Sequence, residues 1–514
     1  MILPAIATSS VPTAETPATV SATSPAGASP AGRWLRGIST SSWERAGVGV
    51  LLVLALVGFV VYPTYPNYDS VYSLLWGREL LGFDQLSFEA YRAPTEHPLA
   101  IAFGALLDPL GGQADRAMIA FSVLSFVVLV MAVYMLAKTA FTPLVGALAA
   151  GLLVTRFDFP FLAARGYIDI SYLAVVMIAA VVEARAPRQR PRTVLVLLAA
   201  AGLMRPEAWL LAGLYWLWLV AKSTWRQRAA YAAFAAIGPL VWVCVDFAVT
   251  GNPTYSLTAT GELADELGRN KGIGEVPDAL YTFLITLTKF PVFLAGVAGL
   301  LIAIVVTPRR SLMPFVLFAS GVGTFAAVGL AGLSVIDRYL LVASLALMIF
   351  AAVLIGGWTM LQEGTLIRKV WAGAGAAVVL AAIVFTVPRV DAGTFDLELR
   401  FRSDARVALE QVLAEPQVGD ALRCGKVYVP NHKLIPDVRW ILDRPASSVL
   451  ARSAVPKGAD VLTPARGVVL LVHDRLAILR QALVTSLDRP EQNLPPPNFD
   501  RIATSNYYAV YARC

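Results

Sequence analysis

The sequence predicts a polytopic α-helical membrane protein with about eleven transmembrane helices and a small C-terminal extracytoplasmic α/β domain. The 514 residues are 57% hydrophobic and only 15% charged, whereas soluble proteins contain about 25% charged residues. Apolar runs of roughly 18 residues or more recur along the chain, and this length is needed to cross a bilayer. The net charge of +7 comes from basic residues in short loops between these runs, so it indicates membrane orientation and no nucleic-acid partner.

The N-terminal region predicts the orientation of the protein in the membrane. Residues 1–32 are rich in Ala, Ser, Thr and Pro and lack basic residues, which is typical of a disordered tail. They do not resemble a signal peptide, because no basic segment precedes an apolar core. Arg33, Arg36 and Arg45 precede the first span, so the tail is expected in the cytoplasm and the loop 63–97 outside.

The remaining transmembrane domain, 33–388, is arranged by the same rule. The stretch 99–110 is short for a span and contains Asp108 and Pro109, so it is interpreted as a juxtamembrane or re-entrant helix on the outer side. The expected spans are 47–62, 117–137, 141–155, 170–183, 193–204, 208–221, 229–248, one ending near 306, 312–333, 339–360 and 370–387. The basic residues that this arrangement places in the cytoplasm are Lys138, Arg185, Arg188, Arg190, Arg192, Lys222, Arg226, Arg228, Arg309, Arg310, Arg368 and Lys369.

Residues 389–514 are expected to form the small extracytoplasmic α/β domain, because short Val- and Tyr-rich runs alternate with helical segments. The expected elements are strands at 426–429, 467–472 and 507–512 and helices at 404–413 and 474–487. Cys424 and Cys514 both lie in this domain. A disulfide between them is possible outside the cytoplasm, and the sequence leaves that pairing open.

Charged residues gather on the outer side of this arrangement. They are Asp69, Asp84, Glu89, Glu96, His97, Asp158, Arg165, Asp169, Arg205, Glu207, Lys289, Asp337 and Arg338. For each residue alone a structural explanation exists: arginines snorkel to the interface, Glu207 suits a helix start after Pro206, and Asp69 suits an N-cap before Ser70. Their recurrence on one side of the membrane instead indicates a functional site.

Four stretches of this set carry a family resemblance. They are Asp69 with Tyr72, Trp76-Gly77-Arg78-Glu79, Gly82 and 93–99 (Ala-Pro-Thr-Glu-His-Pro-Leu); Arg165-Gly166-Tyr167-Ile168-Asp169; Arg205-Pro206-Glu207; and Asp337-Arg338-Tyr339-Leu340. In their order and sidedness they resemble the GT-C superfamily of membrane glycosyltransferases, which includes protein O-mannosyltransferases, the aminoarabinose transferase and arabinosyltransferases. The segment 250–257 (Thr-Gly-Asn-Pro-Thr-Tyr-Ser-Leu) is similar to actinobacterial members.

The resemblance implies an inverting enzyme that transfers a sugar from a polyprenyl-phosphate donor to an envelope glycan, lipid or protein acceptor at the outer face, among membrane lipids. Such a displacement needs a carboxylate that accepts the acceptor's proton, and Asp69 is the implied base. Lipid phosphate requires Arg or Lys near the headgroup level. The implied residues for donor phosphate or sugar are His97, Arg165, Asp169, Arg205, Glu207, Lys289 and Arg338, with Glu96 and Tyr68 in support.

Several alternatives stay open at this point. A transporter or flippase would place its ionisable residues near the bilayer midplane on broken helices. A ligase or polymerase of envelope polysaccharides would use the same outer groups on a larger lipid-linked donor, and a non-enzymatic scaffold would need none of them. The family often has paired acids in its first outer loop, but Ser70 follows Asp69 here. This departure puts metal dependence in doubt: a divalent cation is possible, and its ligands stay unknown.

Overall fold

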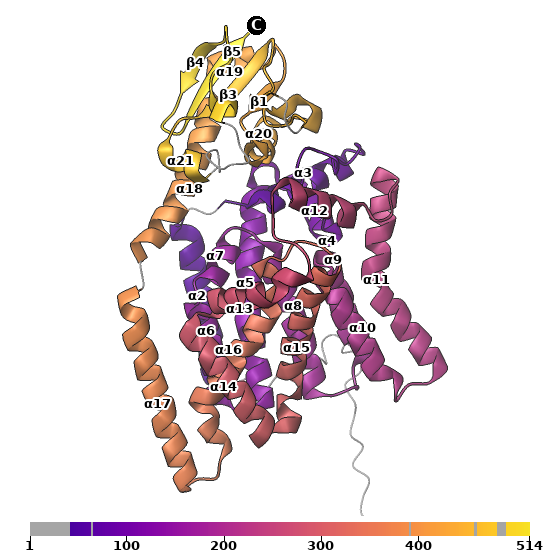
Figure 1. Ribbon diagram of the computed structural model, residues 1–514, viewed down its shortest axis with the longest axis vertical. Coiled ribbons are helices and arrows are strands. Elements are labelled where there is room, and N and C mark those ends of the chain that lie inside the picture. The colour runs from indigo at the N-terminus through magenta and orange to yellow at the C-terminus, as the bar shows by residue number, and fades with distance from the viewer. Residues whose placement is uncertain (1–41, 63–64, 390–391, 457–459, 481–489) are drawn as a thin grey trace, which may run out of the picture. The chain divides into compact units, whose positions relative to one another are not determined.

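The computed structural model describes residues 42–62, 65–389, 392–456, 460–480 and 490–514 (Figure 1). The tail expected at 1–32 lies outside these residues. The chain divides into two compact units, 1–50 and 51–514, and the second contains every element after α2 (Ser42–Val61).

The part before residue 390 is almost entirely helical. Its α-helices after α2 are α3 (Tyr68–Leu81), α4 (Pro98–Leu107), α5 (Ala114–Ala140), α6 (Pro143–Thr155), α7 (Asp158–Ala164), α8 (Ile168–Arg185), α9 (Pro191–Met204), α10 (Glu207–Val220), α11 (Trp225–Thr250), α12 (Tyr255–Glu266), α13 (Val276–Thr288), α14 (Phe290–Val306), α15 (Pro308–Leu330), α16 (Leu341–Gly356) and α17 (Leu366–Thr386). Short 3₁₀ turns join some of them, and η3 (Asp337–Leu340) leads into α16. Helix α16 is buried on almost every side and forms the centre of this part.

Among the described residues, six helices are long and apolar enough to cross a membrane, or up to eight if each of two bent pairs is one span. The pairs are α6 with α7, bent by 62°, and α13 with α14, bent by 106°. Helices α9 and α10 are apolar but shorter. The polytopic fold class is thus supported, whereas the count of about eleven stays a prediction.

The apolar stretch after the first outer loop is interrupted. Helix α4 has only 10 residues, and Gly111 breaks the helical path before α5 with φ 55° and ψ −128°. Pro98–Ala140 covers 43 residues, which is about twice the length of one span. The expectation of a separate short helix here is confirmed, and its re-entrant position stays a prediction.

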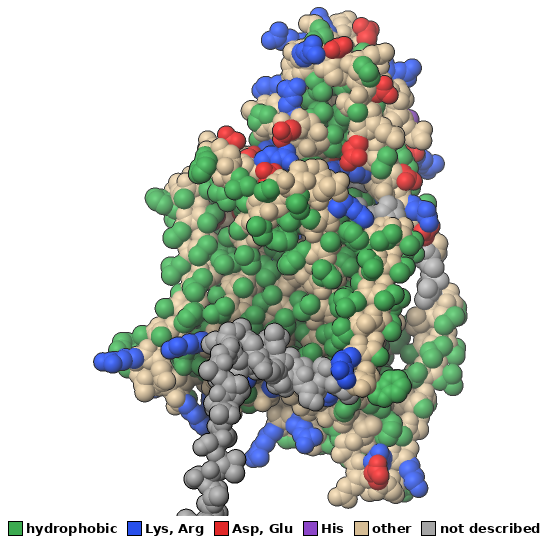
Figure 2. Space-filling model, turned by 180° about the vertical axis from the view of Figure 1, so that it is seen from behind, with side chains coloured by type: hydrophobic (Ala, Val, Ile, Leu, Met, Phe, Trp, Pro, Cys, Tyr) green, Lys and Arg blue, Asp and Glu red, His purple; other side chains and the backbone are tan. Residues whose placement is uncertain are grey.

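Charge is distributed unevenly about this helical part. Figure 2 shows a broad zone of hydrophobic side chains on one face, with Lys and Arg gathered along its lower edge. Acidic side chains on this face occur mainly beyond the opposite edge, toward the C-terminal domain. This separation agrees with the sidedness inferred from the basic loops.

Helices α3 and α4 pack backbone to backbone through two glycines. A Cβ on Gly77 would lie 2.2 Å from the backbone nitrogen of Ala105, and a Cβ on Gly104 would lie 2.2 Å from the carbonyl oxygen of Ser73. Any side chain at either position would push the helices apart. This contact fixes the position of α3 and therefore of Asp69, which lies in its first turn.

The C-terminal part contains helices and a five-stranded mixed sheet in the order β2-β1-β3-β5-β4. Strand β1 is parallel to β2 and β3, whereas β5 is antiparallel to β3 and β4. The elements are α18 (Ala392–Leu413), α19 (Pro416–Ala421), β1 (Val427–Val429), α20 (Ile435–Leu442), β2 (Val449–Ala451), β3 (Gly467–Val472), α21 (Arg475–Arg480), β4 (Asp500–Thr504) and β5 (Tyr508–Arg513). The three predicted strands are confirmed, and β2 and β4 were missed.

The two predicted helices of this part are confirmed within α18 and α21, although the end of the second, at 481–487, lies outside the described residues. The Cys424–Cys514 disulfide is formed and joins the segment before β1 to the end of β5. A disulfide agrees with an oxidising, extracytoplasmic environment.

Helix α20 contacts the first outer loop directly. Trp440 packs with Val71, Leu74 and Leu75 of α3. The buried guanidinium of Arg439 donates a 2.6 Å hydrogen bond to Glu79 at the other end of α3. Helix α3 is therefore held between α4 on one side and α20 on the other.

Candidate functional site

Several helices begin at one place, and the candidate residues lie at their starts. Asp69 and Asp169 are second in α3 and α8, Glu207 is first in α10, His97 caps the start of α4, and Arg338 lies in η3 just before α16. Helix N-termini carry partial positive charge and free N–H groups. A group of such N-termini favours carboxylates from the protein or an anionic ligand.

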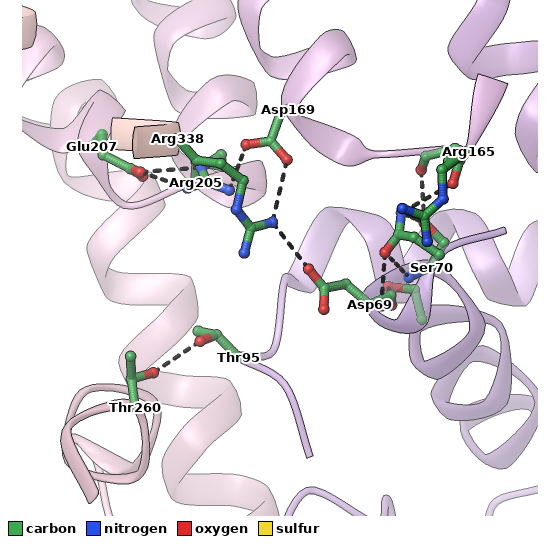
Figure 3. A network of polar contacts seen from close by, with 12 residues as sticks. Asp69, Ser70, Thr95, Arg165, Asp169, Arg205, Glu207, Thr260 and Arg338 are labelled. Carbon is green, nitrogen blue, oxygen red and sulfur yellow. Dashed lines mark hydrogen bonds and ion pairs between the residues drawn. The ribbon is translucent and has the colours of Figure 1, made fainter. Parts of the chain in front are cut away.

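The side chains at these helix starts form one ionic cluster, consisting of Asp69, Asp169, Arg205, Glu207 and Arg338 (Figure 3). Arg205 lies 2.8 Å from Asp169 and 2.9 Å from Glu207. Arg338 lies 3.2 Å from Asp69 and 3.7 Å from Asp169. All five were candidates from the sequence, and the structure brings them together from segments up to 269 residues apart.

The cluster has a buried side and an open side. The side chain of Asp169 is fully buried, and those of Arg205 and Glu207 are nearly so. Asp69 and Arg338 retain 24% and 30% of their side-chain exposure. The Asp69–Arg338 pair is therefore the part of the cluster that a ligand can reach.

Asp69 is not the helix cap that the sequence allowed as an alternative. The N-cap of α3 is Asn67, whose side chain accepts hydrogen bonds from the backbone N–H groups of Asp69 and Ser70. A carboxylate at Asp69 is thus unnecessary for capping. A first-turn acid still gains a modest dipole interaction of about 0.3–1 kcal/mol.

His97, Glu96 and Tyr68 line the surroundings of the cluster. Burial and the nearby Arg205 lower the pKa of His97 to about 4, so its ring is neutral at physiological pH. Its Nδ1 atom has no hydrogen-bond partner among the described residues. Burial raises the pKa of Glu96 to about 7. The hydroxyl of Tyr68 donates to the carbonyl of Arg92, 2.9 Å away.

Two predicted residues lie apart from the ionic cluster. Arg165 stacks on Tyr65, Phe161 and Tyr167, and Figure 3 shows it with Ser70, away from Arg338. Lys289 is exposed at the bend between α13 and α14 and has no ion pair among the described residues. Neither side chain contacts the cluster through a described hydrogen bond or ion pair.

Arg269 is a candidate that the sequence analysis missed. It follows α12 in a loop that was expected on the outer side. The residue is exposed overall, but partial burial and the positive charge of Arg338 lower its pKa, against the opposing influence of Tyr339 and Asp69. Within the described part of the chain, its guanidinium has no carboxylate ion pair. A guanidinium without an ion pair is suited to binding an anionic ligand. The sequence did contain an indication of this residue. Basic residues are preferred in cytoplasmic loops, and Arg269 is a basic residue in a loop that was expected outside.

The carboxylates of the cluster do not fit a divalent cation. Asp69 and Asp169 both face the guanidinium of Arg338, which occupies the position between them. No group of three or more His, Cys, Asp or Glu side chains suited to holding a metal ion occurs among the described residues.

Comparison with known proteins rests on structure. No family model and no curated protein matches this sequence. The crystal structure of ArnT from Cupriavidus metallidurans in the apo state matches with a TM-score of 0.52 and 13% identity, over 92% of this chain and 98% of that chain. The oligosaccharyltransferase of Archaeoglobus fulgidus in its apo form covers 80% of this chain and 65% of its own length, with 12% identity and a TM-score of 0.49. The likeness to ArnT shows a shared fold.

Proposed function

We propose that this protein is a GT-C glycosyltransferase that transfers a sugar from a polyprenyl-phosphate-linked donor to an envelope glycan, lipid or protein acceptor at the outer face of the membrane. The ionic cluster at the converging helix starts is the observation that carries this proposal. It combines a reachable carboxylate, Asp69, with a reachable cation, Arg338, 3.2 Å apart. The ArnT-like fold supports it.

The lipid phosphate binds Arg338 and Arg269 at the open side of the cluster. Guanidinium groups bind phosphate through two parallel hydrogen bonds, and the surrounding helix N-termini favour an anion. The cluster holds three carboxylates against two arginines, so Arg269 is needed to balance the protein charges before phosphate arrives. Arg205 is already engaged by Asp169 and Glu207, and it maintains the shape of the site.

Phosphate binding also prepares the base. Asp69 is paired to Arg338. A phosphate on Arg338 competes with Asp69 for the same N–H groups, and the displaced carboxylate becomes free to accept a proton. Chemistry at Asp69 is thereby linked to the presence of the donor.

Transfer is a single displacement. The acceptor hydroxyl oxygen attacks the anomeric carbon while the bond from that carbon to the phosphate oxygen breaks. The lipid phosphate leaves with the bonding electron pair and is stabilised by the arginines, and Asp69 takes the hydroxyl proton. General-base help of this kind contributes about 10²–10⁴-fold.

The same proposal sets the membrane topology. About eleven spans place the N-terminus in the cytoplasm, and the first outer loop and residues 389–514 outside. In a Cys244→Ala background, Thr258→Cys is expected to react with an impermeant thiol reagent in intact cells, and Gln189→Cys only after lysis. The opposite labelling pattern would overturn the topology.

The function is tested by Asp69→Asn and Arg338→Ala with a panel of synthetic polyprenyl-phosphate sugars. Asp69→Asn should fold normally, because Asn67 caps α3, yet transfer should fall by about 10²-fold or more. Arg338→Ala should weaken donor use, whereas Arg309→Ala, a matched change at the start of α15, should not. Near-normal transfer by well-folded Asp69→Asn protein would remove Asp69 from the catalytic role.

A further inference from the structure

A cavity of about 250 Å³ lies between the segment 88–96 and helix α12. We propose that this cavity binds one hydroxyl-rich sugar ring of the substrate. Its volume is slightly below the range of roughly 300–1,000 Å³ that suits drug-sized ligands, so it fits a ligand of about one ring. The inference rests on the proposed function, and it specifies how that site recognises a sugar.

Glu96 lies in the cavity wall and needs a hydrogen-bond donor, which a ligand can supply. Its side chain is buried, with 3% exposure, and its Oε2 atom has no hydrogen-bond partner among the described residues. The neighbouring Asp246 is satisfied, because it accepts bonds of 2.9 and 2.6 Å from the N–H and hydroxyl of Ser256. An unsatisfied buried carboxylate oxygen is costly, and a sugar hydroxyl would remove that cost.

The rest of the wall suits the same ligand. Thr95 and Thr260 face each other with hydroxyl oxygens 2.8 Å apart, and Glu262 adds a second carboxylate from α12. An ion pair of 3.1 Å between Arg92 and Glu266 joins the two sides of the cavity. Carboxylates accept hydrogen bonds from the hydroxyl groups that a sugar offers.

Apolar side chains from α12 complete the wall. Ala259 and Leu263 line the cavity beside these polar groups, and they offer a surface for the C–H face of a ring. Burial raises the pKa of Glu96 to about 7, and the carboxyl accepts hydrogen bonds from hydroxyls in either form and donates one when protonated.

The cavity is anchored to the ionic cluster at both ends of its 92–96 wall. The carbonyl of Arg92 accepts a 2.9 Å hydrogen bond from Tyr68, which directly precedes Asp69. Glu96 directly precedes His97, whose charge state depends on Asp69, Asp169, Arg205 and Arg338. Adjacent residues are about 3.8 Å apart along the chain, so both ends of this wall are joined to residues next to the cluster or to His97. The ring can come from the donor or from the end of a glycan acceptor.

The test measures binding of methyl glycosides of glucose, mannose, galactose and arabinose to the full-length protein in detergent, by saturation-transfer NMR. Glu96→Gln keeps the shape of the side chain and should lower the affinity for the glycoside about tenfold or more. Ala259→Trp fills the cavity and should abolish binding, whereas Glu415→Gln, an exposed glutamate outside the cavity, should not change it. Absence of glycoside binding to the wild-type protein, or equal binding by Glu96→Gln and wild type, would overturn the proposal.

Competition separates the two sources of the ring. A polyprenyl-phosphate sugar should displace the glycoside if the cavity holds the donor sugar, and leave it bound if the cavity holds the acceptor. Glycoside binding with the expected variant pattern, but without transfer from any donor, would refute the proposed function and leave the sugar site standing.

Discussion

The contact between α3 and α4 predicts that Gly104→Ala will impair catalysis more than folding. The added Cβ would lie 2.2 Å from the carbonyl oxygen of Ser73, whereas atoms in favourable contact are about 3.5–4.0 Å apart. Helix α3 must therefore shift by about 1 Å. Because Ser73 donates its hydroxyl to the carbonyl of Asp69, 3.0 Å away, Asp69 moves with it.

The magnitude follows from two separate effects of that shift. Overpacking in a close-packed interior typically costs about 1–3 kcal/mol of stability, which a folded membrane protein can survive. A 1 Å misplacement of reacting groups can cost about 10²-fold in rate, since the base no longer meets the acceptor hydroxyl. We therefore expect transfer to fall about 10²-fold in a protein that still folds.

The assay compares sugar transfer and thermal unfolding in detergent for Gly104→Ala and Gly151→Ala. Gly151 lies on the apolar helix α6, where an added Cβ meets nothing within 4 Å, so Gly151→Ala controls for the change of residue type. Gly104→Ala should lose transfer, and Gly151→Ala should retain it. Equal transfer by the two proteins would show that the α3–α4 contact does not position Asp69.

Three further predictions concern stability. Burial lowers the pKa of His97 to about 4, so between about pH 6.5 and 4 the ring is neutral in the folded protein and protonated in the unfolded chain. The free energy of unfolding should therefore fall by up to about 3 kcal/mol as the pH drops through this range. Unfolding curves of His97→Gln should lack this loss. Cys424→Ser opens a disulfide that spans 90 residues and should cost about 2–5 kcal/mol in thermal unfolding, whereas Cys244→Ser, which removes a free cysteine, should not. Arg439→Ala leaves Glu79 without its buried arginine partner and should lower the free energy of unfolding by about 3–5 kcal/mol. Limited proteolysis should then cleave the C-terminal domain faster. Unchanged cleavage would mean that Trp440 alone holds α20.

The sequence predicted what local patterns encode. Apolar runs indicated most of the long helices, and Val- and Tyr-rich runs indicated three of the five strands. It missed α12, which lies in a polar stretch. It also missed that α13 is a separate helix, because the apolar pattern is interrupted at the bend between α13 and α14. Strands β2 and β4 were missed because β2 has only three residues and β4 contains charged residues on an exposed edge.

The candidate site was predicted as a set of residues and not as an arrangement. Each of Asp69, Asp169, Glu207 and Arg338 lies beside a recognisable helix start, so the sequence could indicate each one separately. Which carboxylate meets which arginine depends on contacts between helices, such as Asp69 with Arg338 across 269 residues. Lys289 and Arg165 show the limit of this reasoning, since both were expected on the outer side, yet neither contacts the cluster through a described hydrogen bond or ion pair.

Arg269 indicates which sequence signal still holds information about the site. The preference for basic residues in the cytoplasm accounts for most Lys and Arg in this chain, so a basic residue on the outer side needs another explanation. Lys271, close to Arg269, finds it in a 2.5 Å ion pair with Asp265. Arg269 has no such pair among the described residues; burial and the charge of Arg338 lower its pKa, whereas Tyr339 and Asp69 raise it. Arg269 thereby offsets the excess of carboxylates in the cluster, and in the proposed reaction it shares the lipid phosphate with Arg338.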